Sequence, residues 1–426
     1  MSADGEREGG GAARALGQSQ SPATLDAEGI VFLGPGAFEI ARYRVDPPGP
    51  GEVRVRMAAS GVCHSDLHVL DGHWARPAPL VMGHEGAGWV ESVGPAAGGG
   101  PKAAGRPSVA AEPDATGAAS PGPRRGPRVG DLVVLAWTAP CGRCAACLRG
   151  EGWLCISPAG SGHRRAAGDV RIRRPDGTAL GAYSGIGTMG SVQVVAADAA
   201  IPVDPRTDPA VAALIGCAVT TGVGAVTRSA RVQPGQTVAV VGLGGVGLAA
   251  VLGARLAGAR RIVAIDRLPA KLDRAAELGA TDLLVAGADP SETAASLRAI
   301  RAGWGEGRDG VDHSFDASGS IAGIETALAA VRPGGTTTLV GMPPQAARLE
   351  LDVYSFVESG ARILACNYGS AVPSEIFVEL ARHSVEGSLP LERLVEERIG
   401  LADVAAAFEA LRRGDGARRV IIFAQG

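Results

Sequence analysis

The stretch Gly242-Leu-Gly244-Gly-Val-Gly247 constrains the fold of this chain more than any other. It follows the apolar run at residues 237–241, which predicts a buried strand, and precedes an Ala- and Leu-rich segment that predicts a helix. In that context the glycines permit a tight turn and let backbone amides approach a pyrophosphate at a helix N-terminus. We interpret the stretch as a dinucleotide-binding turn, formed by Gly242, Gly244, Gly245, Val246 and Gly247. The alternative is a glycine-rich helix packed on a sheet without a ligand.

The next apolar run, residues 261–266, ends in Asp266. A carboxylate about 20 residues after the glycines accepts both hydroxyls of an adenosine ribose. It also repels the 2′-phosphate of NADP, so the sequence favours NAD. Arg267 follows directly and leaves NADP open.

Strand-like and helix-like runs alternate from residue 219 to about 366. This alternation predicts a doubly wound parallel sheet, the Rossmann arrangement, within an α/β protein. Short strand patterns at 52–57, 90–94 and 131–135 predict a β-rich first domain at 29–218, with a flexible insertion at 95–128. Residues 367–426 are expected to return to the first domain. Residues 1–28 contain almost no large apolar side chains, which predicts disorder.

Composition narrows the class of protein. The chain has 426 residues and a net charge of -3, so no basic field indicates nucleic-acid binding. It shows no secretory leader pattern, and its apolar stretch at 237–252 is broken by glycines and too short to cross a bilayer. We therefore expect a cytoplasmic protein without a membrane partner, whose cysteines are metal ligands or free thiols.

Four cysteines, Cys141, Cys144, Cys147 and Cys155, have the spacing C-x2-C-x2-C-x7-C. Four thiolates on one short loop complete the tetrahedral shell of zinc and leave no open position, which predicts a structural zinc site. A disulfide knot is disfavoured by the reducing compartment. An iron–sulfur cluster is disfavoured because the fourth cysteine of the bacterial ferredoxin run comes after three residues and precedes proline.

A second group of polar residues surrounds Cys63 and His84, which are ligand types that zinc prefers. Asp66 offers a carboxylate that could hold a ligand imidazole from behind. Ser65 and His68 place a hydroxyl and a second imidazole near Cys63. The residues indicate an open zinc site with a proton path beside it. Considered without its relation to other residues, Cys217 is interpreted as a small buried apolar residue, as is Cys366.

Taken together, the order of these motifs resembles the zinc-dependent alcohol dehydrogenases of the medium-chain dehydrogenase/reductase family. The resemblance covers the chain from about residue 30 to its end, apart from the insertion at 95–128. It implies a GroES-like β-rich catalytic domain, a Rossmann domain, NAD, and two zinc ions per chain, one catalytic and one structural. It also implies that Cys63, His84 and Cys217 hold the catalytic zinc and that Glu85 lies close behind it. Ser65 is then expected to touch the substrate oxygen, and His68 to end the proton relay. The remaining roles implied are contact with the cofactor for His64, Lys271 and Arg418, and lining of the substrate pocket for Trp74 and Trp137.

Some of these roles have ordinary alternatives. His68 could be a surface histidine, and either tryptophan could be plain core packing. Two tryptophans at the pocket would favour slim primary alcohols. The expected function is reversible oxidation of a primary alcohol to its aldehyde with NAD. The alternatives are a thiol-adduct dehydrogenase of the formaldehyde-detoxifying kind, and a non-catalytic NAD-binding relative. The long segment between Cys155 and Cys217 resembles that of dimeric members, which implies a homodimer. Its contact is expected at the edge of the nucleotide-binding sheet, near residues 336–341.

Overall fold

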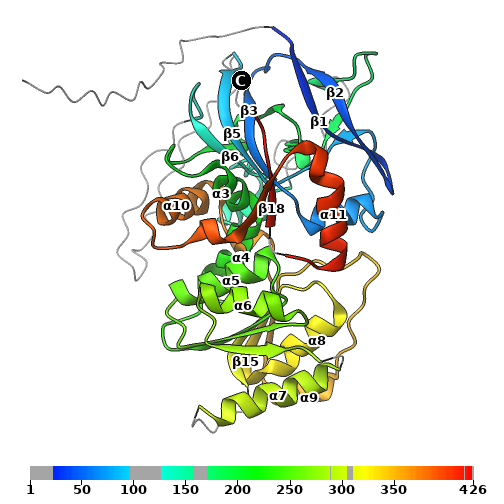
Figure 1. The fold of residues 1–426 in the computed structure, drawn as a ribbon. Helices are drawn as coiled ribbons and strands as arrows, with labels where there is room; N and C mark the ends of the chain where they lie inside the picture. The colour runs from blue at the N-terminus through cyan, green and yellow to red at the C-terminus, as the bar shows by residue number, and fades with distance from the viewer. Residues whose placement is uncertain are drawn as a thin grey trace, which may run out of the picture.

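The computed structural model describes residues 23–95, 126–156, 170–287, 289–304, 310–416 and 418–424. One half of the molecule is built on two mainly antiparallel sheets, and the other half is a parallel sheet with helices packed against it (Figure 1). The predicted α/β class, with a β-rich part and a doubly wound part, is confirmed. The expected insertion at 95–128 lies almost entirely outside the described residues.

The doubly wound half is centred on a buried, valine-rich strand. In the described chain, its six parallel strands are β13 (Asp282–Val285), β12 (Arg261–Asp266), β11 (Thr237–Val241), β14 (Val311–Asp316), β15 (Val331–Leu339) and β16 (Arg362–Ala365), in that spatial order. This is the 3-2-1-4-5-6 order of dinucleotide-binding sheets, in which ligands bind beyond the carboxyl ends of the strands where the order reverses. The edge strand is β16, and β15 lies between β14 and β16. The expectation that residues 336–341 form the sheet edge is therefore wrong.

Helices connect these strands in pairs. Contacts join α5 (Gly245–Leu256) to α6 (Pro269–Leu278), and α7 (Pro290–Ala302) to α8 (Ile321–Ala330). Two such layers are expected when right-handed crossovers join parallel strands. The short α9 (Val353–Ser359) precedes the edge strand and has no buried residue.

The β-rich half contains two further sheets. One is formed by β7 (Ile172–Arg173), β2 (Ala37–Val45), β1 (Leu25–Gly34), β4 (Leu80–Val81) and β8 (Gly181–Ala182). The other is formed by β10 (Ala200–Pro202), β6 (Leu132–Leu135), β5 (Gly86–Val93), β3 (Glu52–Gly61), β18 (Arg418–Ile422) and β17 (Val395–Ile399), with β9 (Val192–Ala196) also paired to β3. The C-terminal strand β18 pairs with β3, so the end of the chain returns to its beginning (Figure 1). Helices α10 (Pro373–Val385) and α11 (Val404–Arg413) precede that return.

The start of the ordered chain differs from the expectation. Residues 25–28 were expected to be disordered, but β1 begins at Leu25 and pairs with Val45. Ala27 is buried, and the buried Arg54 donates a hydrogen bond to the Ala23 carbonyl at 2.7 Å. A small side chain therefore packs in this strand although large apolar residues are scarce. Residues 1–22 lie outside the described part of the chain.

A long apolar helical run, Pro209–Ser229, links the two halves. It contains α3 (Pro209–Leu214), a π-helical turn η4 (Ile215–Val219), α4 (Thr220–Gly224) and a second π-helical turn η5 (Ala225–Ser229). In the described residues it is the one helix long and apolar enough to cross a membrane, but 89% of it is buried inside the protein. The largest apolar cluster joins its residues to the parallel sheet and to β3, β5 and β6, so it serves as a core helix.

Candidate metal and cofactor sites

The structure brings Cys63, His84, Glu85 and Cys217 together. One ligand atom of each lies within 4.8 Å of the others, and all four residues are buried. Cys63 caps α1 (His64–Leu70), His84 and Glu85 directly precede β5, and Cys217 lies in the π-helical turn η4. Turns of this kind are frequent at functional sites. Nothing in the sequence around Cys217 predicted the turn.

Asp66 connects two members of this group. Its Oδ2 accepts a hydrogen bond from the Cys63 backbone at 3.1 Å, and its Oδ1 lies 3.1 Å from His84 Nδ1. The prediction that the Asp66 carboxylate holds an imidazole, here that of His84, is therefore confirmed. A carboxylate accepts hydrogen bonds, so Asp66 favours a proton on Nδ1 and leaves Nε2, 3.5 Å from Cys217 Sγ, as the nitrogen that can bind a metal. The imidazole is held in the tautomer that a metal requires.

The electrostatics of the group fit a cation. The Cys217 thiol, by hydrogen bonding, and then Arg418, by its charge, lower the pKa of Cys63 despite burial. Burial raises the pKa of Glu85 to about 8, although Arg418 opposes the rise. Both Glu85 oxygens lack a hydrogen bond among the described residues, and Oε1 lies 3.4 Å from Arg418 Nη2. A buried carboxylate beside two sulfur atoms and an imidazole matches the donor set of zinc.

The four cysteines of the loop also converge. The Sγ atoms are 4.0 Å apart between Cys141 and Cys147, and 3.9 Å apart between Cys144 and Cys155. A tetrahedral zinc with Zn–S bonds of about 2.3 Å implies sulfur separations of about 3.8 Å. All seven cysteines are free thiols, which removes the disulfide alternative. This spacing fits a closed zinc site.

The glycine turn has the geometry that its sequence predicts. Gly242 has φ +88°, and a Cβ on Gly247 would lie 1.8 Å from the Gly242 carbonyl oxygen, so neither position accepts a side chain without strain. Gly244 caps α5, whose first residues Gly245, Val246 and Gly247 form the helix N-terminus. Backbone amides there can receive a phosphate.

Asp266 lies beside this turn, at the end of β12. Its Oδ2 accepts a hydrogen bond from Leu243 N at 2.7 Å, its Oδ1 accepts one from Leu268 N at 3.0 Å, and Lys271 Nζ lies 4.0 Å away. Arg267 is exposed. The carboxylate is thus fixed next to the glycines, where an adenosine ribose would be bound in this fold.

Arg418 lies between the glycine turn and the metal group. It is buried, donates to the Val62 carbonyl at 3.1 Å, and its Nε has no hydrogen-bond partner among the described residues. A Cβ on Gly245 would lie 2.1 Å from that Nε. Desolvation lowers the pKa of His64, and the charges of Arg418 and Lys271 lower it further. The two cations and this imidazole therefore lie close to the turn.

The proposed relay and pocket residues occupy the same region. Ser65 is half-buried at the second position of α1, and the His68 ring lies 4.7 Å from the Trp74 ring. The Trp74 indole N–H lies 3.5 Å from the Pro343 carbonyl of the parallel-sheet half. Trp137 stacks on Tyr368, with ring centroids 4.1 Å apart.

Three residues near the metal group were not anticipated. Tyr183 packs edge-on against the His84 ring at 5.4 Å, and the Tyr368 hydroxyl donates to the Gly216 carbonyl at 2.7 Å, next to Cys217. His73 contacts His68. Neither tyrosine belongs to a motif, so no sequence signal could have found it. The five-residue spacing of His68 and His73 is the sequence signal that could have indicated their contact.

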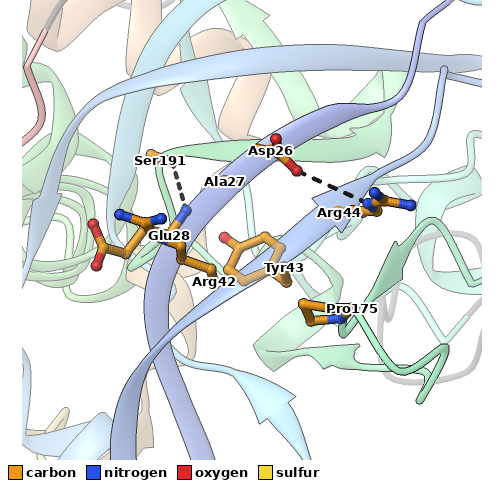
Figure 2. Close-up of a pocket in the computed structure, with 8 residues that line it drawn as sticks. All are labelled: Asp26, Ala27, Glu28, Arg42, Tyr43, Arg44, Pro175 and Ser191. Atoms are coloured by element: carbon orange, nitrogen blue, oxygen red, sulfur yellow. Dashed lines mark hydrogen bonds and ion pairs between the residues drawn. The ribbon is translucent and has the colours of Figure 1, made fainter.

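A surface groove of about 440 Å³ lies elsewhere, along β1 and β2. Figure 2 shows that it is lined by side chains of both charges, including the ion pair between Asp26 and Arg44 at 3.9 Å. None of its lining residues belongs to either metal group or to the glycine turn. We assign no ligand to it.

Comparisons with known proteins agree with this geometry. The alcohol dehydrogenase GroES-like domain matches residues 49–205, and the zinc-binding dehydrogenase domain matches residues 245–384. A curated S-(hydroxymethyl)glutathione dehydrogenase from Synechocystis sp. is 33% identical over 90% of this chain and 96% of its own length.

Two solved structures extend the comparison. An alcohol dehydrogenase zinc-binding domain protein from Burkholderia ambifaria has a TM-score of 0.80 and 30% identity, and covers 95% of this chain and 100% of that one. Benzyl alcohol dehydrogenase from Acinetobacter calcoaceticus has a TM-score of 0.79 and 26% identity, with coverages of 94% and 100%. The fold, the two metal groups and the dinucleotide turn therefore agree with these matches. The chain belongs to the zinc-dependent alcohol dehydrogenases of the medium-chain dehydrogenase/reductase family, and it is an NAD-dependent oxidoreductase.

Proposed function

We propose that this protein reversibly oxidises primary alcohols to aldehydes with NAD at a zinc site formed by Cys63, His84 and Cys217. The observation that carries the proposal is the convergence of these three residues, from distant parts of the chain, beside the buried carboxylate of Glu85. Three protein ligands leave one coordination position for the substrate. A non-catalytic relative would be expected to lack one of the three.

The bound groups supply the two halves of the chemistry: zinc polarises the alcohol oxygen as a Lewis acid, and NAD accepts the hydride. The protein's own residues do the rest. Asp66 orients His84, and the aromatic rings of Tyr183 and Trp137 exclude water around the ligand group. In the loop, Cys141, Cys144, Cys147 and Cys155 hold the structural zinc.

Proton transfer is assigned to Ser65 and His68. Ser65 follows the ligand Cys63 by two residues and provides a hydroxyl that can accept the alcohol proton and pass another on. Burial, and then the nearby His73 charge, lower the pKa of His68. A lowered pKa keeps the imidazole neutral near pH 7, so that it can receive the proton.

Cofactor binding is assigned to the glycine turn and its surroundings. Asp266 accepts the ribose hydroxyls, Lys271 lies beside it, and Arg418 and His64 face the pyrophosphate position. A carboxylate at that place favours NAD over NADP. The exposed Arg267 is the residue through which NADP could still be accepted.

The substrate pocket is assigned to Trp74 and Trp137. Large rings on both sides narrow the space near the metal, which favours slim primary alcohols. A second candidate is the oxidation of an S-(hydroxymethyl) thiol adduct, because curated relatives carry that activity in their names. It uses the same zinc and NAD groups and differs only in the substrate.

A homodimer is the proposed assembly, in the cytoplasm. We place the contact between the two subunits at the edge strand β16, which in the described chain pairs only with β15. The neighbouring α9 exposes Val353, Tyr354 and Val357, each by 66% or more. An unpaired edge beside exposed apolar side chains favours self-association. Light scattering of the protein and of Val357→Glu tests this contact.

The decisive experiment measures zinc content and turnover together. We expect about two zinc ions per chain, and reduction of NAD in preference to NADP with a panel of primary alcohols. Formaldehyde is then offered with and without glutathione. Turnover only with glutathione would favour the second candidate, and a chain with no NAD-linked turnover of any alcohol or adduct would contradict both.

A further inference from the structure

Two histidines touch at the outer end of α1. His68 Nδ1 lies 3.2 Å from His73 Nδ1, with ring centroids 5.4 Å apart. The chain folds back after Leu70, and the backbone N–H of Trp74 donates to the His68 carbonyl at 3.1 Å. This turn places His73 against the end of the helix. A single shared proton therefore fits between the two Nδ1 atoms.

The two rings differ in their surroundings. His68 is half-buried, stacked on Trp74 and close enough to the Met342 backbone to interact with it, whereas His73 is exposed. Nδ1 of His68 faces His73, and the backbone of Met342 also interacts with the His68 ring. One ring faces the protein interior and the other faces water.

We propose that His73 is a further residue of the proton path, which takes the proton from His68 and releases it to solvent. The inference rests on the proposed alcohol oxidation, and it moves the outer end of the path from His68 to His73. His73 touches neither the metal group nor the glycine turn, so it acts through His68 alone. Among the described residues, His73 is the one histidine with both a hydrogen bond and a ring contact to His68.

The proton balance is simple. Oxidation of one alcohol transfers a hydride to NAD and releases one proton. The proton reaches His68 and makes it an imidazolium; its Nδ1–H bond then breaks as an Nδ1–H bond forms on His73. His73 gives one proton to water or buffer, and the pair returns to its starting charge.

Charges around the pair set its pH dependence. His68 is faced by His73 and Asp71 from the turn and by Cys63 from the start of α1, and it also interacts with His64. Asp71 is itself paired with Arg412 of α11. After burial, the positive charge of His73 is the largest influence that lowers the pKa of His68. Removing His73 should therefore raise the pKa of His68 and shift the acid limb of the kcat/KM profile to higher pH.

The test compares His73→Asn with His383→Asn in the zinc-loaded full chain. His383 is a matched control, because its Nδ1 also has a neighbouring partner, Ser388 Oγ at 2.6 Å, far along the chain on α10. For His73→Asn we expect proton release in a single turnover, followed with a pH indicator, to slow by roughly 3- to 10-fold in dilute buffer. Added imidazole should restore it, and the acid limb should move up by roughly 0.5 pH unit. Zinc content and the KM for alcohol should stay unchanged.

A double variant identifies the order of the two residues. If His73 acts only through His68, His68→Asn should slow release more than His73→Asn, and the double variant should match His68→Asn. Additive losses, or a His73→Asn enzyme with unchanged pH profile and no response to imidazole, would overturn the inference. An inactive wild-type chain would instead reject the proposed function and this inference with it.

Discussion

The two metal groups of this protein are built in opposite ways. The four-cysteine group lies within one short segment, Cys141 to Cys155, and two of its members are only half-buried. The other group takes Cys63, His84 and Cys217 from three separate elements and buries them all. The first is local and complete in itself, and the second exists only when three distant segments of the chain pack together.

The surroundings of the two metal groups also differ. Around the loop group, backbone N–H groups of Cys141 and Cys144 point at neighbouring sulfur atoms, each at 3.4 Å. Around the buried group lie charged side chains, Asp66, Glu85 and Arg418, one of which ties a ligand in place. Four sulfurs with backbone donors suit a closed structural ion, whereas an open position with charged neighbours suits chemistry. Variants of the two groups can therefore separate a structural role from a catalytic one.

The largest expected effect is on turnover. Replacing Cys63 with serine removes a thiolate from the open group, so we expect NAD-linked alcohol oxidation to fall by at least about 10³-fold. Zinc should fall from about two to about one ion per chain, while the fold remains. Steady-state kinetics and metal analysis measure both. Cys366→Ser is the matched control, because Cys366 is a buried cysteine outside both groups; equal losses in the two variants would remove the special role of Cys63.

The loop group should instead govern stability. We expect Cys144→Ser to lower the free energy of unfolding by about 3 kcal/mol, because a structural zinc site contributes its binding energy to folding. Chemical denaturation of this variant and of Cys63→Ser gives the comparison. If Cys63→Ser destabilised the protein more than Cys144→Ser, the division into structural and catalytic sites would be reversed.

Asp66 tests whether a charged neighbour matters to the buried group alone. Asp66→Asn removes the carboxylate that holds His84, so zinc affinity at this group should fall by roughly 10- to 100-fold. The loop zinc should be unaffected. Competition with a chelator measures the two affinities, and Asp204→Asn, which changes a half-buried aspartate paired with Arg206, is the control. Equal weakening of both zinc sites would argue for a general loss of structure.

The smallest effect concerns the metal-free protein. The pKa of Glu85 is raised from 4.5 to about 8 by burial, so the folded state holds a proton that the unfolded chain releases. Its contribution to stability is therefore complete below pH 4.5 and is lost as the pH rises toward 8. The slope is at most about 1.4 kcal/mol per pH unit for one group. Unfolding of metal-free wild type and Glu85→Gln between pH 5 and 8 tests this, and parallel curves would contradict the raised pKa of this buried carboxylate.

Local patterns predicted most of the secondary structure. The strands Thr237–Val241 and Arg261–Asp266 have the bounds that their apolar runs indicated. Two features were not predicted, because no pattern in the neighbouring residues indicates them. Leu25 joins a strand by main-chain pairing that no apolar pattern marked, and the π-helical turn at Cys217 depends on packing against neighbouring elements.

By itself, the sequence determined the dinucleotide turn and the four-cysteine group, because each is contained in a single short segment whose residue types impose its geometry. It also determined which residues could be ligands of the second metal. Only the tertiary structure decided that Cys217 meets Cys63 and His84, and that Arg418 returns from the C-terminus to lie beside Glu85. The physical reason is distance along the chain: contacts between remote segments are fixed by the packing of whole sheets and helices, which no local pattern encodes.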